Sequence, residues 1–206
     1  MKFTIDSTFL NALADPSPTP AGGSAAAYAG AMAAALVTMV AQTTITKKKY
    51  AAVQPRMQQI ATEAEACRTE LEACVSRDAA AFDALIAAYR ANKASPDPAT
   101  IEQATLVVTV VPLGTANTAL HVLELAVEIA ETGNINAVSD ACAAATLAHS
   151  SLFASLLNVK VNAKSLDAHR AESFLTQAAD IDTHAAALMS HLHRIIQERA
   201  NIHAAR

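Results

Sequence analysis

The sequence contains no tryptophan, only five glycines, and an aromatic content of 4% over its 206 residues. Sheets are usually rich in aromatic and β-branched side chains, so this scarcity argues against a β-rich fold. Charged residues amount to 17% and the net charge is −4. This balance gives no basic surface for nucleic acid or for an anionic membrane. The sequence therefore predicts neither of these partners.

Cysteine is also scarce, and no CxxC pair is present. Cys67 and Cys74 are seven residues apart, a separation of about two helical turns that makes a disulfide between them difficult. With Cys142 they are interpreted as small buried side chains in a reducing compartment. The first residues, MKFTIDSTFL, are not a basic region followed by a long apolar core, so no signal peptide is expected. We expect a cytoplasmic location.

Several catalytic signatures are missing as well, because the chain has no HExxH motif, no GxSxG motif and no P-loop. Five of the seven histidines follow residue 168. His184, His191 and His193 share a predicted helix with Glu198, but the ExxH step of a di-iron bundle is absent. The sequence therefore predicts no metal site.

Alanine dominates a composition that is 52% hydrophobic, and alanine is the strongest helix former. Pro112 and Gly114 interrupt one of the helical segments, where a kink or break with exposed carbonyls is expected. The prediction is an all-α, up-and-down bundle of about five long helices, one of them kinked near Pro112, in a single domain spanning residues 1–206. The expected helices cover about 8–14, 24–47, 55–90, 99–131 and 166–201, and a further one is entered within 134–140 and continues to about 157.

The stretch 15–50 has an unusual order of residue types. Three prolines keep the approach extended, Gly22 and Gly23 permit close contact with the backbone, and Ser24 can cap the helix that follows. One interpretation is a loop that presents a helix N-terminus to an acceptor-rich or anionic ligand. The other is a tight entry loop to a capped core helix. A single short glycine motif does not decide between them.

The helix after this loop is uncharged from residue 23 to residue 45, which is long enough to cross a membrane. Its alanine, glycine and threonine content, and its paucity of Leu, Ile and Phe, favour a buried helix of a soluble protein instead. The run ends in Lys47, Lys48 and Lys49. These side chains either complement the helix dipole in solvent, or one of them turns inward to bind a carboxylate.

Asp78 interrupts an apolar stripe on the helix predicted for 55–90. An acid at such a position must be paired, must face a cavity, or must have a pKa raised by burial. In the last case it could exchange protons near neutral pH. A salt bridge to a neighbouring helix is the alternative. The predicted stripe comprises Ala64, Cys67, Leu71, Val75, Phe82, Leu85 and Tyr89.

Two further segments are dense in polar groups. Asn134, Asn136, Ser139 and Asp140 lie within GNINAVSD at 133–140. Helix capping accounts for Ser139 or Asp140, but it does not require both asparagines. NVKVN at 158–162 is predicted to be a polar-edged turn.

Taken together, these segments resemble the cyclodeaminase/cyclohydrolase family. The resemblance is carried by PTPAGGSAAAYAGAMAAALVTMV with KKKY, DAAAFDALIAAY at 78–89, VPL at 111–113, GNINAVSD and NVKVN, in family order across nearly the whole chain. That family comprises methenyltetrahydrofolate cyclohydrolases and the cyclodeaminase domain of formiminotransferase-cyclodeaminase. One departure is Ala21, where the family usually has a third glycine.

The resemblance implies an all-helical homodimer that binds a tetrahydrofolate derivative, with no other cofactor. It implies that Asp78 is the catalytic acid/base. The folate contacts that it implies are Gly22, Gly23, Ser24, Lys47, Lys48, Lys49, Asn134, Asn136, Ser139, Asp140, Asn158 and Asn162. The lysines would suit the carboxylates of the glutamate tail.

Two reactions fit the resemblance. A cyclohydrolase adds water to the bridging carbon of 5,10-methenyltetrahydrofolate, and a cyclodeaminase closes a ring on 5-formiminotetrahydrofolate and releases ammonia. The TITKKKY and VNAKSLD segments favour the cyclohydrolase. The alternative from another class is a non-catalytic helical bundle that binds a partner protein. It predicts that Asp78 is paired to a basic residue with no cleft beside it.

Overall fold

The computed structural model describes residues 7–95 and 97–200. The described residues form helices without strands, and five of these helices are long, which confirms the predicted all-α class. Pro55 lies in the first turn of the longest helix, as expected. In chain order the elements are α1 (Thr8–Ala14), α2 (Gly22–Ile45), η1 (Lys48–Val53), α3 (Gln54–Ala94), α4 (Pro98–Thr132), η2 (Ile135–Ala137), α5 (Val138–Ala163) and α6 (Ala168–Ala200).

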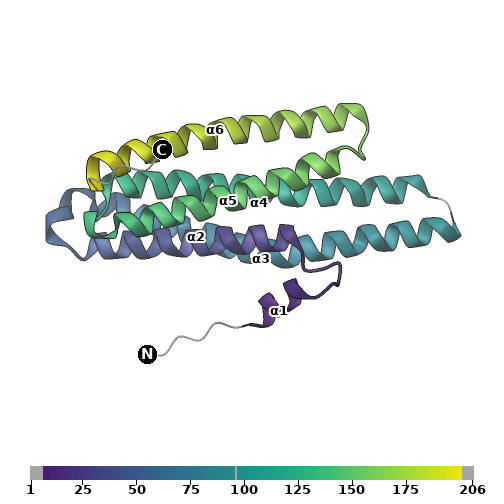
Figure 1. Cartoon of the computed structure of the whole chain (residues 1–206), viewed down its shortest axis with the longest axis horizontal. Helices are drawn as coiled ribbons and strands as arrows, with labels where there is room; N and C mark the ends of the chain where they lie inside the picture. The colour runs from purple at the N-terminus through teal and green to yellow at the C-terminus, as the bar shows by residue number, and fades with distance from the viewer. Residues whose placement is uncertain (1–6, 96, 201–206) are drawn as a thin grey trace.

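Four helices make the central bundle. α2 packs against α3 and α5, and α4 packs against the same two helices from the other side. α6 covers α4 and α5, while the short α1 lies outside the bundle (Figure 1). Towards the turn that joins them, α3 and α4 project beyond the start of α2 (Figure 1). The bundle is complete over the length of α2, and beyond the start of α2 the helices α3 and α4 extend farthest (Figure 1).

Small side chains let α2 and α5 approach closely. A Cβ at Gly30 would lie 2.7 Å from the Ser151 hydroxyl of α5, a distance that real Cβ atoms do not adopt. Ala27 and Ala34, about one turn on either side, are fully buried. The hydroxyls of Ser151 and Ser155 are buried without a hydrogen-bond partner. Small residues therefore bring the backbones of α2 and α5 close together at this level of the core.

α4 continues through Pro112 without a break. Proline has no N–H, so the carbonyl of Val108, four residues earlier, loses its helical partner. The side-chain amide of Asn162, on α5, donates a hydrogen bond to that carbonyl at 2.6 Å. The exposed carbonyl predicted from the sequence is thus present, and a neighbouring helix satisfies it.

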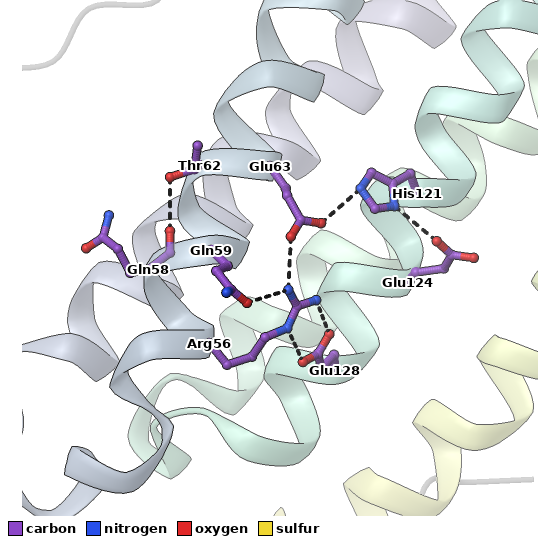
Figure 2. Close-up of polar contacts among 8 residues, drawn as sticks. All are labelled: Arg56, Gln58, Gln59, Thr62, Glu63, His121, Glu124 and Glu128. Carbon is purple, nitrogen blue, oxygen red and sulfur yellow. Dashed lines mark hydrogen bonds and ion pairs between the residues drawn. The ribbon is translucent and has the colours of Figure 1, made fainter.

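A polar network joins α3 to α4 away from the Asp78 region (Figure 2). The Arg56 guanidinium donates two hydrogen bonds of 2.7 Å to the Glu128 carboxylate and one of 2.9 Å to Glu63. His121 lies between Glu63, at 3.2 Å, and Glu124, at 3.1 Å. Every acid in this network has a basic neighbour.

Three segments are long and apolar enough to cross a membrane by length and composition: α2, α4 and Ile135–Ala163. Within the bundle, 56%, 50% and 44% of their most apolar windows are buried. The sequence had singled out the first of these segments. The folded chain thus uses about half of each apolar window for packing between helices.

Several predicted boundaries need correction. α2 begins at Gly22, so Ser24 is its third residue and not its cap. α5 continues to Ala163, so NVKVN at 158–162 is helical and not a turn. Glycine at 133 suggests a left-handed C-terminal cap, but Gly133 ends α4 at φ −78°, outside that region. Of Ser165 and Asp167, the two cap candidates that the sequence offers for α6, Asp167 accepts bonds from the backbone N–H groups of His169 and Arg170. Of the candidates Asp6 and Ser7 for α1, Asp6 lies outside the described residues and Ser7 makes no side-chain cap bond.

Candidate active site

Asp78 lies on α3 at the level where α2 begins. The apolar stripe of α3 was predicted correctly as far as Leu71, but the residues buried beyond it are Cys74, Ala81 and Ala88, while Phe82 and Tyr89 are exposed. The predicted stripe drifted because a straight helix has 3.6 residues per turn and not 3.5. Asp78 lies between Cys74 and Ala81 on the corrected stripe, so its carboxyl group points inward.

The Asp78 carboxylate caps α2 from a neighbouring helix. The Ser24 hydroxyl donates to Asp78 Oδ2 at 2.9 Å, and it also lies 3.0 Å from the Val75 carbonyl oxygen. The Ser24 backbone N–H also bonds to Asp78. These groups belong to the first turn of α2, whose own cap residue, Ala21, supplies no side-chain bond. Ser24 is fully buried. It therefore orients the carboxylate and has no surface of its own to offer a ligand.

Gly23 is required by this arrangement. A Cβ at position 23 would lie 2.0 Å from Asp78 Oδ1 and 2.5 Å from its carboxyl carbon. The carboxylate therefore rests directly on the backbone of residue 23. The glycine selected from the sequence as a place of close approach does have that role, but the group that approaches it is a side chain of the protein.

The pKa of Asp78 is raised above its usual value, chiefly because burial disfavours the charged form. The two bonds from Ser24 act in the opposite direction and reduce the shift. No ion pair with Asp78 is formed by the part of the chain that the structure describes. The salt-bridge interpretation is therefore excluded within residues 7–95 and 97–200, and a carboxyl group able to exchange a proton remains.

A cavity of about 240 Å³ opens beside Asp78. The extended segment before α2 forms one wall, and α3, α4 and α5 form the others. Thr19, in that segment, donates to Asp83 of α3 at 3.1 Å, which ties the segment to the bundle. Among the described residues, Asp78 is the one ionisable side chain in the lining. The lining residues are Pro18, Thr19, Ala21, Gly22, Gly23, Asp78, Ala81, Phe82, Val108, Val111, Asn158, Val161 and Asn162.

Five of the residues singled out from the sequence thus meet at one cavity, namely Gly22, Gly23, Asp78, Asn158 and Asn162. The sequence missed the apolar lining. For Val108 a signal existed, since it lies four residues before Pro112. For Phe82 the signal was misread, because its place in the predicted stripe assigned it to the core.

The lysines lie at the other end of the bundle. Lys47, Lys48 and Lys49 follow the last residue of α2, whose 24 residues span about 36 Å. All three are exposed, and the Lys49 ammonium lies 4.8 Å from the centroid of the Tyr50 ring. Within one chain they cannot contact a ligand that touches Asp78 unless the ligand spans that length.

The 133–140 segment lies at the lysine end too. The Asn134 N–H donates to Thr44 Oγ1 at 2.9 Å, and the Asn134 side chain accepts from the N–H of Asn136 at 3.2 Å. Ile135 N–H donates to the Tyr50 hydroxyl at 2.9 Å. Ser139 and Asp140 lie in the first turn of α5 and do not cap it. Most of this polarity therefore holds the end of α2 against the start of α5.

The comparisons with known proteins agree with this fold. The family model described as formiminotransferase-cyclodeaminase matches residues 6–180. The chain is 39% identical over 200 residues to a methenyltetrahydrofolate cyclohydrolase of Methylorubrum extorquens, covering 94% of this chain and 96% of that protein. It is 28% identical to the formimidoyltransferase-cyclodeaminase of Rattus norvegicus, of which it spans 34%.

A solved structure has the same fold over nearly its whole length. The crystal structure of a formiminotetrahydrofolate cyclodeaminase from Thermotoga maritima matches with a TM-score of 0.88 at 26% identity, and the match covers 94% of this chain and 96% of that one.

Proposed function

Since this chain belongs to the formiminotransferase-cyclodeaminase family, we propose that it is a methenyltetrahydrofolate cyclohydrolase that converts 5,10-methenyltetrahydrofolate to 10-formyltetrahydrofolate. The observation that carries the proposal is Asp78, a half-buried carboxyl group with no cationic partner among the described residues, on the wall of the cavity. The relative that matches over nearly the full length of both chains is named for the same reaction.

Asp78 would act first as a base. A water held between the carboxylate and the bridging carbon loses a proton to Asp78 while its oxygen bonds to that carbon. The resulting tetrahedral carbon carries a hydroxyl group between N5 and N10 of the folate. Asp78 then returns the proton to N5 as the bond from carbon to N5 breaks, and the hydroxyl proton leaves to solvent as the formyl group forms on N10. A raised pKa suits a group that both accepts and donates.

The negative charge of the Asp78 carboxylate would also stabilise the bound substrate. The methenyl bridge is cationic, and a partly desolvated carboxylate within a largely apolar lining stabilises a cation more strongly than one in bulk water. Gly22, Gly23, Asn158 and Asn162 would contact the folate from the two sides of the cavity. Ser24 would act through Asp78.

The second candidate is the formiminotetrahydrofolate cyclodeaminase reaction. It is favoured by the Thermotoga maritima structure, which shares the fold and is named for that activity. It also passes through a tetrahedral carbon between N5 and N10 and needs one group to move a proton. The non-catalytic alternative predicted a basic partner for Asp78 and no cleft, and the cavity beside an Asp78 without an ion pair disfavours it.

The deciding experiment follows the loss of methenyltetrahydrofolate absorbance with purified protein, in parallel with ammonia release from formiminotetrahydrofolate. We expect activity in the first assay. Activity in the second assay alone would replace the cyclohydrolase assignment by the cyclodeaminase, and activity in neither would reject both.

Four further properties belong to the proposal. We propose that the protein is cytoplasmic, that it needs no cofactor beyond the folate substrate, and that it acts as a homodimer of single-domain chains spanning residues 1–206. We also propose that it binds neither nucleic acid nor membrane, on the basis of a net charge of −4 and of apolar helices half used in packing.

A further inference from the structure

The side-chain amide of Asn162 has a fixed orientation where it lines the cavity. Its Nδ2 donates a hydrogen bond of 2.6 Å to the carbonyl oxygen of Val108, on α4. A carbonyl oxygen carries no hydrogen, so only the NH2 end of an amide can approach it at this distance. The other end of the amide, Oδ1, is therefore turned away from Val108. It accepts no hydrogen bond from the part of the chain that the structure describes.

Pro112 is the cause of this orientation. In an uninterrupted α-helix the N–H of residue 112 would donate to the Val108 carbonyl, but proline has no N–H. The carbonyl lies in a partly buried position, so it needs a donor from outside α4. Asn162 of α5 is that donor. A proline inside one helix thus selects which end of an amide on the next helix is bound, and which end remains for the cavity.

Asn158, one turn earlier on α5, also lines the cavity but is not constrained in this way. No hydrogen bond joins its side-chain amide to another residue within 7–95 and 97–200, so either end of that amide can turn towards a ligand. The remaining lining residues of α3, α4 and α5 are apolar, apart from Asp78. Within the described parts of these three helices, Asp78 and Asn162 are therefore the two side chains that present a fixed acceptor to the cavity.

The Asp78 carboxylate can accept a further hydrogen bond from water. A carboxylate offers about four lone-pair positions, and Ser24 uses two of them through its hydroxyl and its N–H. The cavity of about 240 Å³ has room for a water, which needs roughly 30 Å³, together with part of a larger ligand. A water that donates one hydrogen to Asp78 and the other to Asn162 Oδ1 keeps its lone pairs for a third group.

Hydrolysis needs such an oriented water. A water that donates only one hydrogen rotates about that bond, whereas two donated hydrogens fix the direction of its lone pairs. During attack on the cationic bridging carbon, Asp78 takes one hydrogen as a proton. A lone pair of the water oxygen forms the new bond to carbon, and a carbon–nitrogen π pair moves onto nitrogen. The second hydrogen stays on the oxygen, bonded to Asn162 Oδ1, until the formyl group forms and it leaves to solvent as a proton.

We propose that Asn162 Oδ1 positions the attacking water beside Asp78, and that Pro112 acts through Asn162 by keeping this oxygen turned to the cavity. This role rests on the proposed function, because it is the hydrolysis of the methenyl bridge that consumes a water. Ring closure by N10 of the substrate, as in the cyclodeaminase reaction, would not need it. The role concerns the chemical step, so its loss lowers kcat and leaves folate affinity unchanged.

A double variant tests the role of Asn162 without unfolding the site. Asn162→Ala alone leaves the Val108 carbonyl without a donor and should lower the melting temperature. Pro112→Ala returns an N–H to α4, so Asn162→Ala/Pro112→Ala keeps that carbonyl bonded and loses only the acceptor at the cavity. We expect kcat of the double variant to fall by about 10- to 100-fold, with its Kd for tetrahydrofolate, measured by calorimetry, within about twofold of wild type.

The single variants test whether Pro112 acts through Asn162. Pro112→Ala releases the amide, so kcat should fall by about three- to tenfold while the protein stays folded. Once residue 162 is alanine, the same substitution at 112 should have no further effect on kcat, which is the non-additivity of two residues in one chain of contacts. Hydrogen exchange of the Asn162 side-chain NH2, followed by NMR, should be slow in the wild type and faster in Pro112→Ala. Equal exchange in the two proteins would remove Pro112 from the proposal.

Asn117→Ala is the matched control. The Asn117 amide also donates to a carbonyl of α4, that of Leu113 at 3.0 Å, but Asn117 does not line the cavity, so kcat should stay within about twofold. A raised Kd with unchanged kcat in the double variant would make Asn162 a folate contact alone and reject the proposal. So would a double variant with the kcat and Kd of the wild type, and in both cases the proposed function stands. A wild type inactive on methenyltetrahydrofolate would reject the proposed function, and the role for water with it.

Discussion

Two acids on α3, Glu63 and Asp78, are four turns apart and have opposite surroundings. Glu63 is partly exposed and lies between Arg56 and His121, in a network that also includes Glu128 and Glu124 (Figure 2). Asp78 is half-buried, is held by a serine, and forms no ion pair with any of the described residues. The first arrangement pairs a carboxylate with basic side chains and joins two helices. The second leaves a carboxylate free to bind a proton.

The difference arises from the lengths of the helices. At Glu63 all four helices of the central bundle are present. The Glu63 carboxylate therefore contacts Arg56 of its own helix and His121 of α4. At Asp78 α2 has just begun, and the position that an earlier turn of α2 would occupy is a cavity. The Asp78 carboxyl group, turned inward there, meets the N–H and hydroxyl of Ser24 and the cavity. The first turn of α2 thus supplies the hydrogen bonds that hold Asp78, and the space before that turn gives room for a ligand.

The largest effect is expected from Asp78→Asn. If Asp78 moves the proton, kcat should fall by about 10²-fold or more. Glu63→Gln is the matched variant on the same helix and should keep kcat within about twofold, because it removes an acid that only links helices. Steady-state absorbance assays of both proteins make the comparison. Equal losses in the two variants, or none in Asp78→Asn, would contradict the distinction.

Gly23→Ala should come next. The added methyl group would lie 2.0 Å from Asp78 Oδ1, so the carboxylate must leave its place, and we expect kcat to fall by about tenfold with a destabilisation of about 1–3 kcal/mol. Gly114→Ala, inside α4, has nothing within 4 Å and should be neutral or stabilising by up to about 1 kcal/mol. Thermal unfolding and kcat measured on both variants test this, and an active Gly23→Ala would show that the carboxylate can act from elsewhere.

Ser24→Ala should shift the pH dependence of kcat/KM, with a smaller effect on kcat/KM at high pH, where Asp78 is ionised in both proteins. The two bonds from Ser24 favour the charged carboxylate, and the variant loses the hydroxyl bond, so the pKa of Asp78 should rise further. The acid limb of the kcat/KM profile, where Asp78 must be ionised to act as a base, should therefore move to higher pH. If kcat/KM falls equally at every pH and the acid limb of the profile does not shift, Ser24 has only a structural role.

Stability should depend on pH through the same group. The pKa of Asp78 is higher in the folded chain than in the unfolded chain, so between the two values the folded state binds more protons, and stability falls as the pH rises. Asp78→Asn should flatten this dependence in the window above the ordinary aspartate pKa of 3.8. Urea unfolding at a series of pH values measures it. An equally steep curve in the variant would assign the dependence to other groups.

The smallest effect is expected from Arg56→Gln. Its ion pairs are partly exposed, and such pairs contribute only about 0.5–1 kcal/mol, so the melting temperature should fall by about 2–4 °C with kcat unchanged. A loss of activity in this variant would mean that the network and the cavity are coupled.

The sequence predicted the helices and the choice of Asp78 because both depend on local pattern. Periodicity shows where an acid interrupts an apolar stripe, and helix formers mark the long segments. It did not predict that Ser24 serves Asp78, because a cap supplied by another helix leaves no trace in the chain around Ser24. The expected helix over 24–47 already placed Gly23 and Lys47 at its opposite ends. Assigning both residues to one folate site, as the resemblance did, left out the length of about 36 Å that the helix puts between them.

The bond from Asn162 to the Val108 carbonyl also fixes how α4 and α5 are connected. Pro112 leaves one acceptor open on α4, and only a side chain at the matching height and angle on α5 can fill it. Inserting one residue between Gly133 and Asn162 would turn Asn162 by about 100° and move it about 1.5 Å along the axis, away from that acceptor. The number of residues between Gly133 and Asn162, which are 29 positions apart, is therefore constrained by this bond. We expect this segment to tolerate substitution far better than insertion.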